Sequence, residues 1–111
     1  MSGVIKQTDW QDKTVLVVVG GDIDMHTSAE LQKGFQEILK NKPERIIVNL
    51  TAVPYMDSSG VASLVKLLST SRKSKIDLRL FGLSKRVKAV FDITRLTTVF
   101  NICNTQEEAM G

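Results

Sequence analysis

The segment Asp57-Ser58-Ser59-Gly60 carries two hydroxyls at the point where a predicted strand gives way to a predicted helix. A serine at a helix N-terminus lies beside free backbone amides and the positive end of the helix dipole. A phosphate added there is stabilised, because anions are favoured at that position. Gly60 leaves the first helical turn without a side chain, so another protein's active site could reach the hydroxyl. The alternative is that Ser58 or Ser59 only caps the helix.

Asp22 and Asp24 form a second candidate site, in the loop that follows an apolar strand. A strand followed by Asp-x-Asp is typical of phosphotransferases with an aspartyl-phosphate intermediate, and carboxylates also bind metal ions. Asp22 could instead only shape the loop, whereas Asp24 could face the loop that holds Ser58. The only histidine, His26, is interpreted as a neighbour of a helix cap rather than as a general base or a metal ligand.

These segments need a scaffold, and the apolar pattern predicts strands and helices in alternation. Four strands are expected at residues 15–19, 45–50, 76–81 and 100–103. Each is followed by a helix, and the expected helix starts are Thr27-Ser28-Ala29-Glu30, Ser58-Ser59-Gly60, Ser84 and Thr105-Gln106-Glu107-Glu108. The first and last of these starts are typical of capping boxes. A short strand at 4–7 is expected to pair with 15–19 across a turn at 9–12.

The run Val15–Val19 is β-branched throughout but for one leucine, which predicts a strand buried on both faces. In the second helix, one buried face is expected to carry Val61, Leu64, Val65 and Leu68. The predicted core includes Val17, Ile47, Val48, Leu64 and Leu80.

The alternation of strands and helices predicts a single α/β domain over residues 1–111, with a mostly parallel central sheet of four to five strands and about four helices. In such a sheet, the loops that leave the carboxyl ends of the strands gather at one edge. We therefore expect the loops at 20–26 and 51–60 to meet, and the functional site to lie there.

Composition excludes several classes of protein. The chain has 111 residues, a net charge of +3 and one cysteine, so an internal disulfide or a cysteine-cluster zinc site is excluded. No export signal or membrane-spanning run is evident, and a cytoplasmic location is expected. Basic residues gather at 72–75 and 85–88, where helices are expected to end and to begin, and we interpret them as solvated faces rather than a nucleic-acid surface.

Three segments together resemble a known family. These are Gly21-Asp22-Ile23-Asp24 after an apolar strand, then Arg45-Ile46-Ile47-Val48-Asn49-Leu50, then Tyr55-Met56-Asp57-Ser58-Ser59-Gly60. The chain resembles a STAS domain, specifically the bacterial anti-sigma factor antagonists, from about Val15 to Phe91. The most specific part is Met-Asp-Ser-Ser-Gly. Many members continue with Leu-Gly, whereas this chain has Val61-Ala62, and both changes keep small or apolar character.

The resemblance implies a β-α superhelix and a regulatory protein that is not an enzyme and holds no cofactor or metal. It places the phosphorylated residue at Ser58. The implied partners are an anti-sigma factor kinase, which binds the unphosphorylated form, and a metal-dependent serine phosphatase, with no direct nucleic acid and no membrane. The residues expected to contact the partner are Asp22, Ile23, Asp24, Asp57, Ser59 and Gly60.

Two other functions stay open at this point. Related STAS proteins serve in stress-signalling assemblies or as subunits of transporters, so the chain could work by docking alone without phosphorylation. A small phosphotransferase that uses Asp22 or Asp24 is the third hypothesis.

Overall fold

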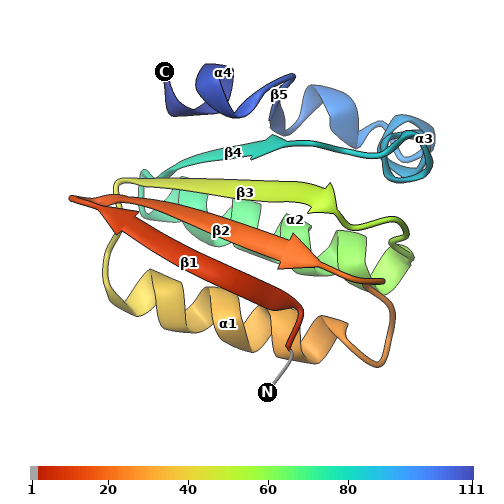
Figure 1. The fold of residues 1–111 in the computed structure, drawn as a ribbon, viewed down its shortest axis with the longest axis horizontal. Helices are drawn as coiled ribbons and strands as arrows, with labels where there is room; N and C mark the ends of the chain where they lie inside the picture. The colour runs from red at the N-terminus through yellow and green to blue at the C-terminus, as the bar shows by residue number, and fades with distance from the viewer. Residues whose placement is uncertain (1–2) are drawn as a thin grey trace.

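The computed structural model describes residues 3–111, which form a five-stranded sheet in the order β1-β2-β3-β4-β5 (Figure 1). The strands are β1 (Ile5–Gln11), β2 (Thr14–Gly20), β3 (Arg45–Ala52), β4 (Asp77–Phe81) and β5 (Asn101–Cys103). The helices are α1 (Ser28–Lys40), α2 (Ser58–Lys73), α3 (Lys85–Ile93) and α4 (Gln106–Met110), and a 3-10 turn, η1 (Leu96–Thr98), follows α3.

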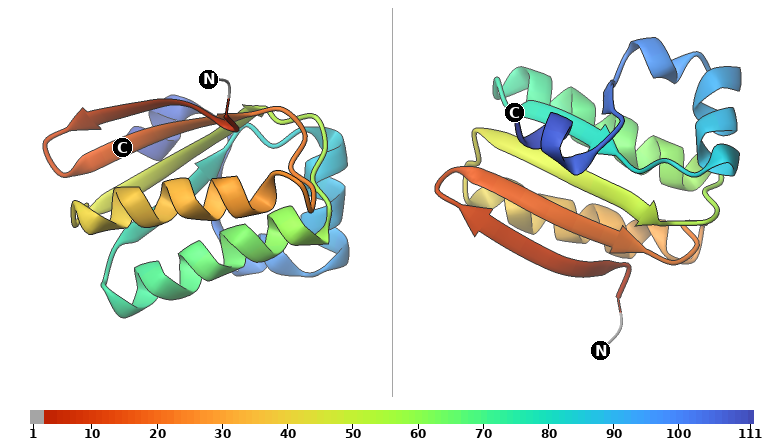
Figure 2. Two further views of the ribbon diagram at one scale, coloured as in Figure 1. Left: turned by 90° about the horizontal axis from the view of Figure 1, so that it is seen from below. Right: turned by 45° about the horizontal axis from the view of Figure 1, so that its top comes forward.

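The predicted fold class is confirmed. β1 pairs with β2 antiparallel, and every later neighbour pairs parallel. α1 and α2 lie side by side on one face of the sheet, α4 lies on the other, and α3 stands at the edge where the strands end (Figures 1 and 2). No helix within residues 3–111 is both long enough and apolar enough to cross a membrane.

The first hairpin is longer than expected. β1 continues through the segment predicted as a turn, and its last residue, Gln11, pairs with Thr14. The turn is therefore only Asp12-Lys13, with Asp12 in the left-handed region at φ 56°. The prediction was wrong because β1 is an exposed strand at the sheet edge, with polar residues along most of its length, so it lacks the apolar alternation that marks a strand.

β2 is buried on one face rather than both. Val15, Val17 and Val19 are fully buried under α1 and α2, while Leu16 and Val18 are only partly buried. Within residues 3–111, the five-residue α4 is the one helix that covers the second face of the sheet, which explains the difference. Beneath α4, a small second core forms from Ile47, Phe81, Cys103 and Ala109.

The predicted core residues Val17, Ile47, Val48, Leu64 and Leu80 are all fully buried. Val65 was wrongly assigned to the buried face of α2, since 38% of it is exposed. The buried face instead runs through Val61, Leu64, Leu67 and Leu68. Successive helical residues are about 100° apart, so Leu64 faces the sheet and Val65 turns away from it.

The expected capping boxes differ in outcome. The Thr105 side chain accepts a hydrogen bond from the Glu108 amide at 3.1 Å, although Glu108 accepts from Asn104 instead of returning to the cap. The box at α1 is absent: the Thr27 side chain makes no cap hydrogen bond. Its partner Glu30 instead accepts from the Val4 amide at 2.7 Å, which ties the start of the chain to α1.

The first prediction tests the orientation of α2. Leu64→Ala should lower the free energy of unfolding by about 2–5 kcal/mol, because it leaves a cavity under a fully buried side chain. Val65→Ala is the matched control, and it should change stability by less than about 1 kcal/mol because Val65 is exposed. Urea unfolding of both variants measures the difference, and equal costs would contradict this orientation.

Candidate functional site

The loops after β2 and β3 meet at the carboxyl edge of the sheet, as predicted. The Ile23 amide donates to the Tyr55 carbonyl and the Asp57 amide donates to the Ile23 carbonyl, both at 3.0 Å. Ile23 and Met56 thereby form a short parallel bridge outside the main sheet. A further bond joins the Gly21 amide to the Ala52 carbonyl at 2.9 Å. The two loops form one unit at the start of α2.

Asp57, rather than either serine, caps α2. Its Oδ1 accepts from the Ser59 amide at 2.8 Å and from the Gly60 amide at 3.3 Å. The alternative that Ser58 or Ser59 caps the helix is wrong, because the carboxylate one residue earlier has the extended backbone of an N-cap. Ser58 is therefore the first helical residue, and it is exposed. Its hydroxyl makes no hydrogen bond within residues 3–111.

Ser59 lies deeper than Ser58. It is half-buried, and its carbonyl accepts from the Ser63 hydroxyl at 3.0 Å. Ser63 is itself buried, and its hydroxyl also donates to the Ser28 carbonyl on α1 at 3.4 Å. The two neighbouring serines are thus distinguished by position: Ser58 faces solvent, and Ser59 lies towards the packing of α2 on α1.

Gly60 is buried, which overturns the idea that it leaves the helix start open to a partner. A side chain added there would put its Cβ 2.5 Å from Met56 Cγ and 2.7 Å from Ile23 Cγ2. Glycine is needed because α2 packs tightly against the bridge between the loops. Ile23 is also fully buried, so it supports the site from beneath and has no surface for a partner.

The carboxylate of Asp24 accepts hydrogen bonds from its own loop. Its Oδ1 accepts from the His26 amide at 2.8 Å and from the Thr27 amide at 3.2 Å. The bond from His26 is the main reason that the pKa of Asp24 lies below its ordinary 3.8. Thr27 Oγ1 donates to the Asp22 carbonyl at 2.9 Å and so braces the same turn. Asp22 is exposed and remains available to a partner.

Sequence reasoning missed an aromatic contact at this edge. The guanidinium of Arg86, at the start of α3, lies 5.3 Å from the centroid of the Tyr55 ring, within the range of a cation–π interaction. Tyr55 is three residues before Ser58, so this contact holds α3 against the loop of the site. No local signal could reveal it, because the two residues are far apart in the sequence. The same loops expose Met25, of which 71% is accessible.

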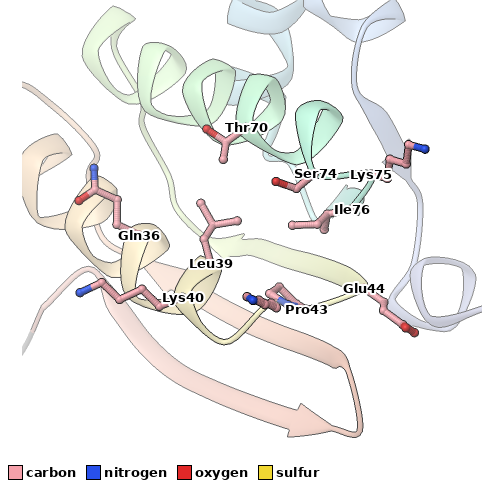
Figure 3. A pocket seen from close by; sticks show the side chains of 10 residues that line it. Gln36, Leu39, Lys40, Pro43, Glu44, Thr70, Ser74, Lys75 and Ile76 are labelled. Atoms are coloured by element: carbon pink, nitrogen blue, oxygen red, sulfur yellow. The ribbon is translucent and has the colours of Figure 1, made fainter.

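A cavity that Figure 3 shows from close by lies away from this site, where the loops enter the strands β3 and β4. It measures about 600 Å³ and lies where α1 and α2 end. The side chains of Lys40 and Lys75 point away from it. Basic residues are favoured near the negative ends of helices, which accounts for their presence without a ligand. Among residues 3–111, no three His, Cys, Asp or Glu side chains gather as a metal site would require.

Comparison with known proteins agrees with this arrangement. The family model for the STAS domain matches residues 6–109. The chain belongs to the STAS domain family. An anti-sigma-B factor antagonist of Staphylococcus aureus is 33% identical over 96 residues, which are 86% of this chain and 89% of that protein. The family resemblance drawn from the sequence is therefore confirmed.

Solved structures share the fold of this STAS domain. The anti-sigma factor antagonist SpoIIAA in its unphosphorylated form has 24% identity and a TM-score of 0.79, over 94% of this chain and 91% of that one. The phosphorylated form of Bacillus SpoIIAA has 24% identity and a TM-score of 0.72, over 94% and 95%. At this identity, the likeness establishes the architecture and not the roles of single residues.

The second prediction concerns Gly60 in this STAS domain. In an open helix, Gly→Ala stabilises by about 1 kcal/mol, but here the close contacts should reverse the sign. We expect Gly60→Ala to lower the free energy of unfolding by about 1–3 kcal/mol through overpacking. The cost should shrink in a Met56→Ala background, where the nearest atom is gone. Urea denaturation of the four proteins in this cycle measures the coupling, and a stabilised Gly60→Ala would disprove the contact.

The third prediction concerns pH. Because the pKa of folded Asp24 is lowered, its carboxylate adds stability above the ordinary value of 3.8, and this stability is lost as the pH falls through the lowered pKa. Asp24→Asn removes that contribution. The Tm gap between wild type and variant should be widest near neutral pH and close in acid. Thermal unfolding across this range measures the gap, and a gap that does not change with pH would contradict the assignment.

Proposed function

We propose that this STAS domain is a phosphorylation-controlled antagonist of an anti-sigma factor. In its unphosphorylated form it binds an anti-sigma factor kinase and thereby releases the sigma factor, and phosphorylation of Ser58 ends that binding. The observation that carries the proposal is that Ser58, the first residue of α2, is exposed and that its hydroxyl makes no hydrogen bond within residues 3–111. Because Asp57 takes the capping role, Ser58 can be modified without loss of the cap.

The electrostatics of this position favour a switch. A phosphoserine carries a charge of about −1.5 to −2 at neutral pH. Here it stands next to the Asp57 carboxylate, which already holds two amides at the helix start. In an interface that fits a neutral hydroxyl, an unpaired buried charge costs several kcal/mol. A loss of about 3 kcal/mol weakens binding more than a hundredfold, so no refolding of the domain is needed.

The comparisons support the same function. The relative in Staphylococcus aureus is named an antagonist of anti-sigma-B factor, and SpoIIAA has been solved with and without its phosphate. We extend the antagonist role and the phosphorylation to this chain. A metal-dependent serine phosphatase would restore the active form in the cytoplasm, with neither nucleic acid nor membrane as a direct partner. The geometry gives no support to a phosphotransferase at Asp24, because backbone amides hold its carboxylate.

The fourth prediction separates the two serines. Ser58→Ala, used as bait in a pull-down from the source cell, should retain the kinase, because this bait cannot be released by phosphorylation. With that kinase and ATP, wild type should gain one phosphate by intact-mass spectrometry and Ser58→Ala none. Ser59→Ala is the matched control, and it should be phosphorylated like wild type. Ser58→Asp should bind the kinase weakly, although one carboxylate carries less charge than a phosphate.

Three results would count against the switch. Phosphate incorporation into Ser58→Ala would show that a residue other than Ser58 is modified. A kinase that binds wild type but never modifies it would leave a STAS module that works by docking alone. A Ser58→Ala variant that unfolds would show that the hydroxyl has a structural role, although loss of an exposed, unbonded hydroxyl should change stability by only about 0.5 kcal/mol.

A further inference from the structure

The outward side of α2 carries an unusual stripe of residues. From Ser58 it continues through Ala62, Val65, Ser69 and Arg72, which follow one another at spacings of three and four. With about 3.6 residues per turn, this spacing places them above one another on one side of the helix. All five are exposed, so the stripe runs over the molecular surface directly from the proposed phosphorylation site.

The neighbouring helix α1 shows what an ordinary solvated face looks like in this protein. Its outward positions include Glu30, Lys33, Glu37 and Lys40, all charged and exposed. Lys40 pairs with Glu37 at 3.4 Å. The α2 stripe has no charge until Arg72, fourteen residues after Ser58. The lack of charge along this strip is the feature it shares with interfaces, whose central parts are depleted in charged residues.

Halfway along the stripe, the surface is hollowed between α2 and the segment after η1. A cavity of about 330 Å³ is lined by Val65, Leu68, Ser69, Arg72, Lys73 and Val99. Arg72 Nη2 donates to the Val99 carbonyl at 3.2 Å, and this bond holds the far wall against α2. Val65 and Val99 are each 38% exposed. We call this hollow the Val65–Val99 groove; it is apolar at its centre and positively charged at one end.

The groove lies within reach of any protein bound at Ser58. At 1.5 Å per residue, Val65 is about 10 Å along the helix from Ser58, and Arg72 is about 21 Å. A partner in a standard interface covers about 800 Å², a patch with a radius of about 16 Å. A kinase centred on Ser58 therefore covers Val65.

We infer that the Val65–Val99 groove is a docking site for the kinase that phosphorylates Ser58, an inference that rests on the proposed function. The fitting occupant is an apolar side chain of the kinase, followed by a carboxylate that meets Arg72 and Lys73. The groove stands apart from the reacting hydroxyl. Its contacts contribute equally to the bound ground state and the transition state, so their loss raises KM and leaves kcat unchanged.

The experiment uses the full chain and the kinase purified on the Ser58→Ala bait. Val65→Glu places a carboxylate in the groove, at an exposed helix position that accepts glutamate. Lys66→Glu is the matched control: it lies about as far along α2 from Ser58 as Val65 does and changes the charge more, but Lys66 lines a different hollow, between α1 and α2, so it separates the groove from mere closeness to Ser58. We expect Val65→Glu and Val99→Glu each to raise KM about tenfold or more, with kcat within about twofold, and Lys66→Glu to stay close to wild type.

Titration of the kinase with each protein in the absence of ATP separates the two proposals. Suppose that wild type binds the kinase and is phosphorylated, and that Val65→Glu and Val99→Glu keep its KM and affinity. The groove is then not a docking site, while the phosphorylation switch stands. An equal loss in Lys66→Glu also overturns the groove, because the effect would then come from general charge. If no kinase is retained on the bait, or none modifies wild type, both proposals fall.

Discussion

The site depends on one contact, the short bridge that Ile23 makes with the segment before α2. Ile23 lies outside the regular strands. Its amide donates to the Tyr55 carbonyl, and its carbonyl accepts from the Asp57 amide, so two hydrogen bonds join the loops. Its side chain fills the space beneath, and α2 can come this close only because residue 60 is glycine. The bridge therefore sets the point where α2 begins, and with it the exposure of Ser58.

The bridge also determines that Asp57, and not Ser58, caps α2. Since it holds Asp57 in an extended conformation, the carboxylate bends back to the amides of α2 and satisfies part of the helix end. The serine that follows is then spared from capping. A hydroxyl that capped the helix would be held by hydrogen bonds to the helix amides and would be less free to enter another protein's active site. Separate residues for capping and for modification avoid that conflict.

Most of the framework could be predicted from the sequence, because local periodicity places the strands and helices and most of the core residues. It did not predict that only one face of β2 is fully buried, nor that Val65 turns away from the sheet. Contacts between distant segments could not be predicted either. Glu30 has the spacing of a capping box, yet it binds the Val4 amide because the fold brings β1 over α1. Gly60 was expected at the surface and lies in the core for the same kind of reason. Arg86 was interpreted as part of a solvated basic cluster, and only the packing of α3 at the sheet edge reveals its contact with Tyr55.

The distance between Ser58 and the Val65–Val99 groove has a consequence for how the switch can work. The two lie about 10 Å apart on one rigid helix, and at physiological ionic strength exposed charges are screened over about 8 Å. A phosphate on Ser58 therefore barely changes the electrostatic potential at the groove. Its charge acts only where the partner touches the serine, and the helix transmits no change of shape, because Leu64 and Leu67 are packed into the core. Release of the partner then requires that the penalty at Ser58 exceed what the groove contributes. A docking groove of modest affinity, formed by two half-exposed valines and a basic end, satisfies that condition, whereas a deep apolar pocket would not.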